Sequence, residues 1–313
     1  MTKKIEDNLE DIPVVNWAVA LGKKIKVPGL EGMSLYDVVE MYIIGIVKGA
    51  LTTRAGGIAF SFFMAIFPFM LFILTVIPYI PIDGFQEGLF GLIKDGLPPK
   101  TFDAVKTVID DIINNQYGGL LSLGFFMSIF LMTNGINAIF GGFEHSYHIK
   151  EHRSNIKAYI IALGVSLLLT LFLIITVTLI ILYQVALAKI DEIGWINTSD
   201  LNLFYYGRAL LFLLMIFTIV SILFRYGTTE GKNIRFFSPG AILTTMLSMS
   251  FFYLFGIYVV KFATYNQLYG SIGTLLILML FVWLNAIILL LGFELNASIN
   301  RLKRINKTSL SAN

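Results

Sequence analysis

Six long stretches without a charged residue constrain this chain more than any other feature of its sequence. They run through residues 55–82, 112–143, 158–188, 209–224, 236–260 and 262–293. A helix needs about 20 apolar residues to cross the roughly 30 Å hydrocarbon core of a bilayer. Five stretches reach that length, and residues 205–207 extend the fourth if Arg208 lies near an interface. Lipid tolerates only helices and closed barrels, and these stretches are too long for barrel strands. We therefore expect an all-α polytopic membrane protein with six transmembrane helices.

These stretches divide the chain into four regions. We expect a cytoplasmic N-terminal segment at residues 1–33, an amphipathic interfacial helix at 34–53, a six-helix membrane domain at 54–297 and a basic cytoplasmic tail at 298–313. Within the membrane domain, the predicted spans cover about 55–81, 118–143, 158–188, 203–224, 237–260 and 270–293.

The composition agrees with this interpretation and excludes some kinds of site. Hydrophobic residues make up 57% of the chain and charged residues 14%, against about 45–50% and 25% in soluble domains. The absence of cysteine excludes disulfides, thiolate metal sites and cysteine nucleophiles. A formal net charge of +3 is too small to indicate nucleic-acid binding. The first residues mix acids with bases and contain no apolar core, so we do not expect a cleaved signal peptide.

The distribution of lysine and arginine predicts the orientation, because cytoplasmic loops carry an excess of these residues. Of the 23 lysines and arginines, 17 lie in segments that share one side of a six-span protein, and five lie in the loops on the other side. The richer segments include both ends of the chain. Both termini are therefore predicted to be cytoplasmic.

An amphipathic segment precedes the first span. Ser34 and Asp37 form a Ser-x-x-Asp pattern, which is typical of a helix N-terminus. The apolar residues that follow have helical spacing. Residues 34–53 are thus expected to form a helix that lies on the cytoplasmic interface or packs under the bundle.

A second amphipathic segment lies between the first two spans. Pro98 and Pro99 precede a stretch in which Phe102 and Ile109 fall on one helical face and charged residues on another. This pattern predicts a short helical cap outside the membrane, on the extracytoplasmic side.

The start of the first span combines a charge, small residues and a proline. Arg54 precedes small residues at 55–57 and 59, which would permit close approach of a neighbouring helix. Ser61 follows, and Pro68 removes a backbone hydrogen bond in mid-span, which should kink or open the helix. A broken helix beside Arg54 would suit an anionic ligand. The commoner arrangement is a tolerated kink with an arginine that reaches lipid headgroups.

Five further polar residues fall inside the predicted spans: Asn134, Asn137, Gln184, Arg208 and Asn285. The uncharged ones could line a polar path, although hydrogen bonding across helices is more common. Asn134 and Asn137 are three residues apart and so share a helix face. Intramembrane charges are costly and indicate function, but Arg208 lies about a turn from the outer interface, where its side chain can reach water.

Glu294 lies at the cytoplasmic end of the last span, near Arg301, Lys303 and Arg304. A salt bridge at the membrane boundary is the simpler account of this carboxylate. A gate or a proton-linked group is the alternative.

The three histidines of the chain, His145, His148 and His152, all fall in one loop beside Glu144 and Glu151. Three histidines could hold zinc with one open position. The loop is also basic, as a cytoplasmic loop would be, and this makes them weak candidates for a metal site. No cofactor is predicted.

Several motifs recur in the order and spacing of a known family. They are Tyr269-Gly-Ser-Ile-Gly273, Trp283-Leu-Asn-Ala286 and Leu291-Gly-Phe-Glu-Leu-Asn-Ala297 around the last span, residues 59–63 with Phe67-Pro68 in the first, and Asn137-Ala-Ile-Phe140 in the second. The chain resembles the YihY/BrkB family of integral membrane proteins over roughly residues 40–300. The resemblance implies six spans in a bacterial inner membrane. The family has carried the label ribonuclease BN, and some members are linked to serum resistance or to tolerance of altered lipid A precursors, which implies envelope roles.

Three functions are compatible with these observations. We expect a transporter or flippase-like protein for a lipid or an anionic solute, with membrane lipids as partners and without nucleic acid. The alternatives are a scaffold or envelope-assembly factor that does not transport and, least favoured, a tRNA-processing ribonuclease, so an enzyme is not expected. The chain lacks an ATP-binding loop, so transport would be passive or ion-coupled. The candidate path residues are Arg54, Ser61, Pro68, Asn134, Asn137, Arg208, Tyr269, Asn285 and Glu294.

Overall fold

A computed structural model describes residues 22–26, 34–80, 84–96, 118–192, 201–261 and 271–310, with residues 19, 102, 106–107, 109–111 and 115. This part of the chain is helical, and its one β-bridge joins Lys26 and Ser34. Six of its helices are long and apolar enough to cross a membrane. The prediction of an all-α protein with six transmembrane helices is confirmed.

The six long helices begin and end close to the predicted spans at most positions. They are α4 (Leu51–Val76), α7 (Gly118–Glu144), α8 (Asn155–Glu192), α9 (Leu201–Tyr226), α10 (Pro239–Lys261) and α12 (Ser271–Leu310). The last one is the main difference, because its 40 residues include most of the segment expected to be a basic tail. At 1.5 Å per residue, α12 is about 60 Å long, about twice the thickness of the hydrocarbon core.

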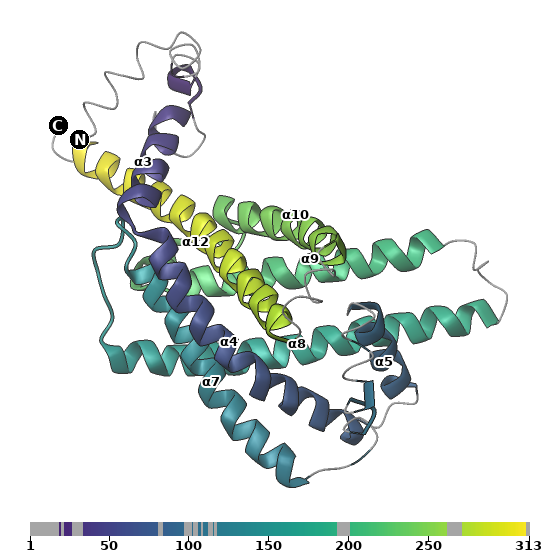
Figure 1. The fold of residues 1–313 in the computed structure, drawn as a ribbon. Coiled ribbons are helices and arrows are strands. Elements are labelled where there is room, and N and C mark those ends of the chain that lie inside the picture. The colour runs from purple at the N-terminus through teal and green to yellow at the C-terminus, as the bar shows by residue number, and fades with distance from the viewer. Residues whose placement is uncertain are drawn as a thin grey trace.

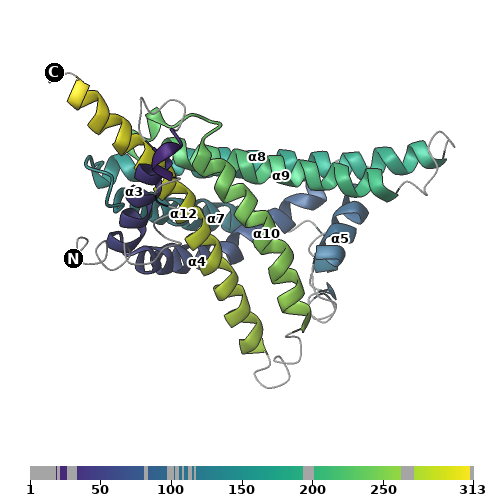
Figure 2. The ribbon, with the colours of Figure 1, turned by 90° about the horizontal axis from the view of Figure 1, so that it is seen from above.

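The long helices form three pairs that meet at one end of the bundle and diverge toward the other. The pairs are α4 with α7, α8 with α9, and α10 with α12. Figure 1 shows α8 and α9 extending side by side away from the other long helices, and Figure 2 shows α10 and α12 extending in another direction. The end where the pairs meet comprises α3 (Leu35–Lys48), residues 145–154, η2 (Thr229–Asn233) and α12 beyond Leu295. We name it the basic end, after Lys48, Arg54, Lys150, Arg153, Lys157, Arg225, Lys232, Arg235, Arg301, Lys303 and Arg304.

The hydrophobic core is concentrated at the basic end. Its centre is the stacked pair Phe143 and Phe293, whose ring centroids are 4.1 Å apart, with Phe224 packed edge-on against both. Toward the other end, large side chains of α10 and α12 lie on the surface, such as Tyr253 and Leu276. The three helix pairs are therefore joined mainly through one end of the molecule.

Glycines of α7 bring this helix close to α4. A Cβ atom at Gly135 would lie 3.3 Å from the Phe62 ring, and one at Gly142 would lie 2.7 Å from Ile58. The sequence had suggested instead that small residues of α4 provide the close approach. Of these, Ala55 and Ala59 are buried, but Gly56 and Gly57 have no neighbouring atom within 4 Å of a Cβ position.

Pro68 does not break the first span. α4 runs through it as one helix of 26 residues. The missing N–H removes a single hydrogen bond, and α7 lies against α4 on both sides of the proline, at Phe62 and at Phe72. The opened helix considered above is therefore not formed.

The helix expected at residues 34–53 is α3, and it ends earlier, at Lys48. Its capping box is complete, because the Asp37 carboxylate accepts from the Ser34 backbone N–H at 2.7 Å while the Asp37 N–H donates to the Ser34 hydroxyl. Gly49 and Ala50, the latter with φ of +45°, turn the chain into α4. Val38 and Met41 pack against Leu302 and neighbouring residues of α12. The position of α3 at a membrane interface remains a prediction.

The loop between the first two spans contains a helix that the sequence did not predict, α5 (Phe85–Gly96), which follows the short 3-10 turn η1 (Ile77–Tyr79). Phe85 and Leu89 bury against Ile181 of α8. The expected cap after Pro98-Pro99 is described only in part, and its described residues 102, 106–107 and 109–111 are helical. Phe102 of this cap packs edge-on against Phe90 of α5.

Candidate functional site

A buried ion pair joins the first and last spans at the basic end. The Arg54 guanidinium donates through Nη2 to Glu294 Oε1 at 2.6 Å, and the two side chains are 7% and 0% exposed. Arg54 lies in the first turn of α4 and Glu294 in the middle of α12. The residues are 240 positions apart in the sequence, so this pair links the first long helix of the bundle to the last one.

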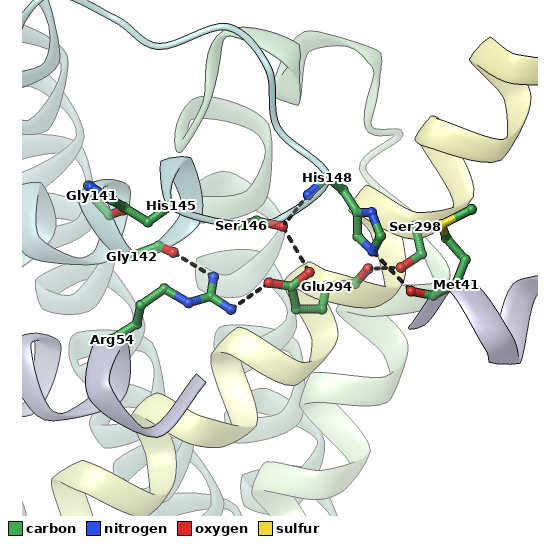
Figure 3. A network of polar contacts seen from close by, with 9 residues as sticks. All are labelled: Met41, Arg54, Gly141, Gly142, His145, Ser146, His148, Glu294 and Ser298. Atoms are coloured by element: carbon green, nitrogen blue, oxygen red, sulfur yellow. Dashed lines mark hydrogen bonds and ion pairs between the residues drawn. The ribbon is translucent and has the colours of Figure 1, made fainter. Parts of the chain in front are cut away.

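Two further elements complete the site (Figure 3). Arg54 Nη1 donates to the Gly142 carbonyl of α7 at 2.8 Å. Ser146, in the loop after α7, donates from its hydroxyl to Glu294 Oε2 at 2.8 Å. Each carboxylate oxygen of Glu294 thus has its own donor. Among the described residues, Arg54 Nε is a buried donor without a partner, so the guanidinium keeps one unused hydrogen-bonding position.

In the segment Gly292–Asn296, nearly every residue contacts a different part of the molecule. Gly292 lies directly against Gly240 and Thr244 of α10, Phe293 stacks on Phe143, and Glu294 meets Arg54. Asn296 accepts from the Gly240 backbone N–H at 2.9 Å and donates to the Ser238 hydroxyl at 2.9 Å. Because Asn296 satisfies a free N–H in the first turn of α10, it serves as an N-cap supplied by another helix.

Replacing Asn296 with alanine is expected to lower the free energy of unfolding by about 1–2 kcal/mol, since it removes a buried cap from α10. The measurement is SDS-induced unfolding of the purified protein in mixed micelles. Asn300 to alanine, on the same helix, is the matched control. Equal stability of the two variants would contradict the capping role of Asn296.

His148 lies beside the ion pair and is fixed in its neutral form by its two hydrogen bonds. Nε2 is 3.0 Å from the Met41 carbonyl oxygen, which can only accept, so Nε2 carries the proton. Nδ1 is 3.1 Å from Arg301 Nη1, which can only donate, so Nδ1 accepts. Burial lowers the pKa of His148 below its ordinary value of 6.5, and this outweighs the opposite effect of the Glu294 charge. A second proton would have to displace Arg301.

This neutral histidine predicts a pH-dependent stability. The unfolded chain binds a proton at His148 more readily than the folded chain does. The contribution of neutral His148 to the free energy of unfolding is therefore complete above about pH 6.5 and is lost as the pH falls. For one proton the slope is at most about 1.4 kcal/mol per pH unit. Unfolding in SDS at pH 5.5 to 7.5 should show this loss in the wild type and a smaller loss in His148→Gln. The exposed His145→Gln variant should behave as the wild type, and equal slopes in all three would contradict the assignment.

The environment of the site also changes the pKa of Tyr42 in α3. Burial, followed by the negative charge of Glu294, raises the pKa of its phenol. On the same helix, a Cβ at Gly45 would lie 2.5 Å from His148 Nε2 and 2.9 Å from Glu294 Oε2. Only glycine allows α3 to approach this closely, so α3 covers the site.

Of the candidate path residues, the structure brings Arg54 and Glu294 together. Asn285 donates to the Phe281 carbonyl of its own helix at 2.8 Å. Ser61, Asn134 and Asn137 are partly buried, and within the described residues their side chains form no hydrogen bond with Arg54 or Glu294. Pro68 is likewise partly buried. Tyr269 lies outside the described residues, as does the side chain of Gln184.

Arg208 takes no part in the site. It lies 3.9 Å from Asp95 of α5, and both side chains are substantially exposed, at 42% and 66%. A surface pair of this kind contributes little free energy. The snorkelling arrangement expected for Arg208 is consistent with this exposure.

The three histidines do not converge on one point. His148 is buried and faces Met41 and Arg301, whereas His145 and His152 are exposed, with ring centroids 6.3 Å apart. No group of three metal-ligating side chains occurs in the part of the chain that the structure describes. These residues therefore do not form the zinc site considered above.

Comparison with known proteins places the chain in a family. The family model described as virulence factor BrkB matches residues 45–312. A ribonuclease-like protein of Bacillus subtilis, YfkH, is 31% identical over 260 residues, covering 81% of this chain and 91% of YfkH. UPF0761 membrane proteins of Coxiella burnetii and Vibrio campbellii are 26% and 24% identical, covering 76% and 80% of this chain and 84% and 77% of their own lengths.

No solved structure matches the chain. The family match includes the start of α4 and the segment Gly292–Asn296, and with them both members of the buried ion pair. The chain belongs to the BrkB family of multi-pass membrane proteins.

Proposed function

We propose that this protein is a transporter or flippase-like protein for a lipid or an anionic solute, and that the Arg54–Glu294 pair locks its basic end. The observation that carries the proposal is the burial of this ion pair where the first span, the last span and α7 meet. Buried charges are expensive, and in membrane proteins they often mark a pathway or a moving part. A buried ion pair also contributes little net stability compared with apolar residues, so stability alone is a poor reason for it.

The arrangement of the helices supports the same proposal. The three pairs meet at the locked end and diverge from it, so a break at the lock would free them to move relative to one another. The lock involves α4, α7, α12 and the Ser146 loop. If Arg54 or Glu294 exchanged its partner, the contacts of all these elements would therefore change together.

The chemistry of Arg54 favours an anionic substrate. Once Glu294 is displaced or protonated, the guanidinium is left with a planar set of donors, one of which is already unused. A phosphate or carboxylate matches that geometry. The excess of lysine and arginine further suggests that the basic end faces the cytoplasm of a bacterial inner membrane, so that release at this lock would be cytoplasmic.

A scaffold without transport activity is the second candidate, and the aromatic core favours it. Phe140, Phe143, Phe224 and Phe293 are fully buried in one core cluster at the basic end, and such packing resists deformation. A scaffold needs the helices to remain fixed, whereas a transporter needs them to separate at this end. Mobility of the lock therefore separates the two candidates.

Hydrolysis of RNA is not part of the proposal. The name of YfkH contains the words ribonuclease-like, but metal-dependent cleavage requires carboxylates or histidines that converge on a metal ion. Among the described residues no such group of three is found. We propose a protein that is not an enzyme and needs no cofactor.

The test is transport by purified protein in liposomes. Liposomes with fluorescent phosphatidylglycerol, phosphatidylethanolamine or phosphatidylcholine are treated with dithionite, which bleaches the outer leaflet only. Parallel liposomes loaded with phosphate or organic anions report solute efflux. Wild-type protein should accelerate one of these processes, and the conservative variants Glu294→Gln and Arg54→Gln should change its rate at least tenfold. Lys157→Gln, an exposed change at the start of α8, should not.

Two results would overturn the proposal. One is the same leaflet asymmetry and efflux in protein-containing and empty liposomes for every lipid and anion. The other is transport that is unchanged in folded Glu294→Gln and Arg54→Gln protein. The first result would favour the scaffold, and the second would separate the ion pair from the transport activity.

A further inference from the structure

An apolar stripe on α3 is exposed in the part of the chain that the structure describes. It consists of Leu35, Val39, Ile43 and Val47, which are four residues apart and so follow one face of the helix. Their exposure rises from 39% at Leu35 to 75% at Val47, the residue nearest to the first span. The opposite face of α3 is the one that packs on α12 through Val38 and Met41. The stripe therefore remains exposed although the helix is docked.

Two cations lie close to one tyrosine ring next to the most exposed end of this stripe. Lys48 follows Val47 in sequence, and its Nζ lies 5.2 Å from the centroid of the Tyr147 ring. The Arg301 guanidinium lies 4.8 Å from the same centroid. Tyr147 itself is 42% exposed. Three elements, α3, the loop after α7 and α12, thus place two positive charges around one exposed aromatic ring.

Neither charge is neutralised by a carboxylate in the part of the chain that the structure describes. The ion pairs formed there are Arg54–Glu294, Arg208–Asp95 and Arg304–Glu230. Arg301 instead donates to the neutral His148 and to the Tyr147 carbonyl. Two like charges held near each other repel, and an anion between them removes that repulsion. The geometry is therefore suited to a bound anion.

We infer that the stripe of α3 and the Lys48–Tyr147–Arg301 group together form a binding site for an anionic phospholipid. An acyl chain covers Val39, Ile43 and Val47, and the headgroup phosphate lies between the two cations. Tyr147 contributes an amphipathic ring at the level where tyrosine is common in membrane proteins. This site is separate from the Arg54–Glu294 lock and does not depend on whether the protein transports anything.

The two parts of the site select a lipid over other anions. A free phosphate would use the cations but leave the apolar stripe exposed to water. A neutral lipid would cover the stripe but leave the two charges without a counterion. An amphipathic helix with an apolar face and nearby basic residues binds membranes that contain anionic lipid. An anionic phospholipid satisfies both parts at once.

The first experiment locates the stripe. The chain has no cysteine, so Val47→Cys and Ile43→Cys can be labelled individually with an environment-sensitive fluorophore in full-length protein. In nanodiscs with brominated phosphatidylglycerol, both labels should be blue-shifted and strongly quenched. A label at Lys303→Cys, an exposed position on α12, should be quenched much less. Equal quenching at all three positions, or at none, would overturn the membrane assignment of the stripe.

The second experiment tests the anion. Phosphatidylglycerol retained by the detergent-purified protein is measured by native mass spectrometry, with phosphatidylcholine and soluble glycerol phosphate as comparisons. Removing one basic residue near an anionic headgroup should weaken retention about fivefold, and Lys48→Glu should weaken it more strongly. Lys303→Gln is the matched control and should retain the lipid.

The outcomes separate the possible occupants of the stripe. Retention of phosphatidylglycerol that is unchanged in Lys48→Glu, or equal retention of phosphatidylcholine, would overturn the inference. Binding of glycerol phosphate as strong as that of the lipid would identify a free-phosphate site instead. A dimer that dissociates in Val47→Glu would identify a second copy of the chain as the occupant.

Discussion

Glu294→Ala is expected to lower the free energy of unfolding by about 3–5 kcal/mol, because it leaves the Arg54 charge buried without a counterion. The Ser146 hydroxyl loses its acceptor as well. SDS-induced unfolding in mixed micelles measures the loss, and far-ultraviolet circular dichroism shows whether the six helices remain. Arg54→Met should cost a similar amount, since it leaves the carboxylate buried and unpaired.

The double variant provides the internal control. When both charges are removed, in Arg54→Met with Glu294→Leu, neither residue leaves an uncompensated charge, and such replacements are often close to neutral. The double variant should therefore be more stable than either single variant. Destabilisation equal to the sum of the two single effects would show that Arg54 and Glu294 do not interact, and would contradict the lock on which the proposed function rests.

Gly292→Ala is the second substitution with a large expected effect, because α12 touches the backbone of α10 at this residue. An added Cβ would collide with the Thr244 side chain and would lie 2.6 Å from the Gly240 carbonyl oxygen. A backbone atom cannot rotate aside, so the cost should reach at least the upper part of the usual 1–3 kcal/mol for overpacking. The same unfolding assay measures it.

Gly56→Ala is the matched control for this prediction. It also adds one methyl group to a transmembrane helix, but its Cβ meets no atom within 4 Å. Alanine is the better helix former by about 0.5–1 kcal/mol, so this change should leave stability equal or slightly higher. If Gly292→Ala and Gly56→Ala behaved alike, close contact between α10 and α12 at Gly292 would be excluded.

The membrane architecture could be predicted from the sequence because lipid imposes a simple rule on it. Each span must be long, apolar and helical, so charge-free stretches located all six spans. The capping pattern at Ser34 located the start of α3 for a similar reason, since both residues of the pattern contact each other locally. The ends of helices outside the membrane follow no such rule. Nothing in the hydropathy indicated that α12 continues to Leu310.

The partners within the site were predictable only in part. The sequence identifies both Glu294 and Arg54 as candidates, but it favours basic residues closer in sequence as the partners of Glu294. The structure assigns Arg301 and Arg304 to His148 and Glu230 instead. Ser146 and Asn296 were missed, since uncharged polar residues carry no periodic signal. The pattern Ser238-Pro239-Gly240 is typical of a helix start, but nothing in the sequence connects it with Asn296, 58 residues further along the chain.

The sequence does not predict α5 because its composition is unfavourable for a helix. Its sequence contains Gly88, Gly91 and Gly96, and glycine is a poor helix former. Contacts with α8 stabilise the helix in spite of its composition, and a Cβ at Gly88 would lie 3.0 Å from Ile181. Tertiary contacts of this kind cannot be read from local sequence.

The close contact at Gly292 makes α12 a lever with its fulcrum near the ion pair. One arm runs from Gly292 to Ser271 and is about 31 Å long, and the other runs to Leu310 and is about 27 Å long. A tilt of about 10° would displace the ends by roughly 5 Å but Glu294, two residues from the fulcrum, by only about 0.5 Å. Tilting can therefore rearrange the far end of the molecule while the Arg54–Glu294 bond stays closed. Rotation of α12 about its own axis, or sliding along that axis, would instead move Glu294 away from Arg54.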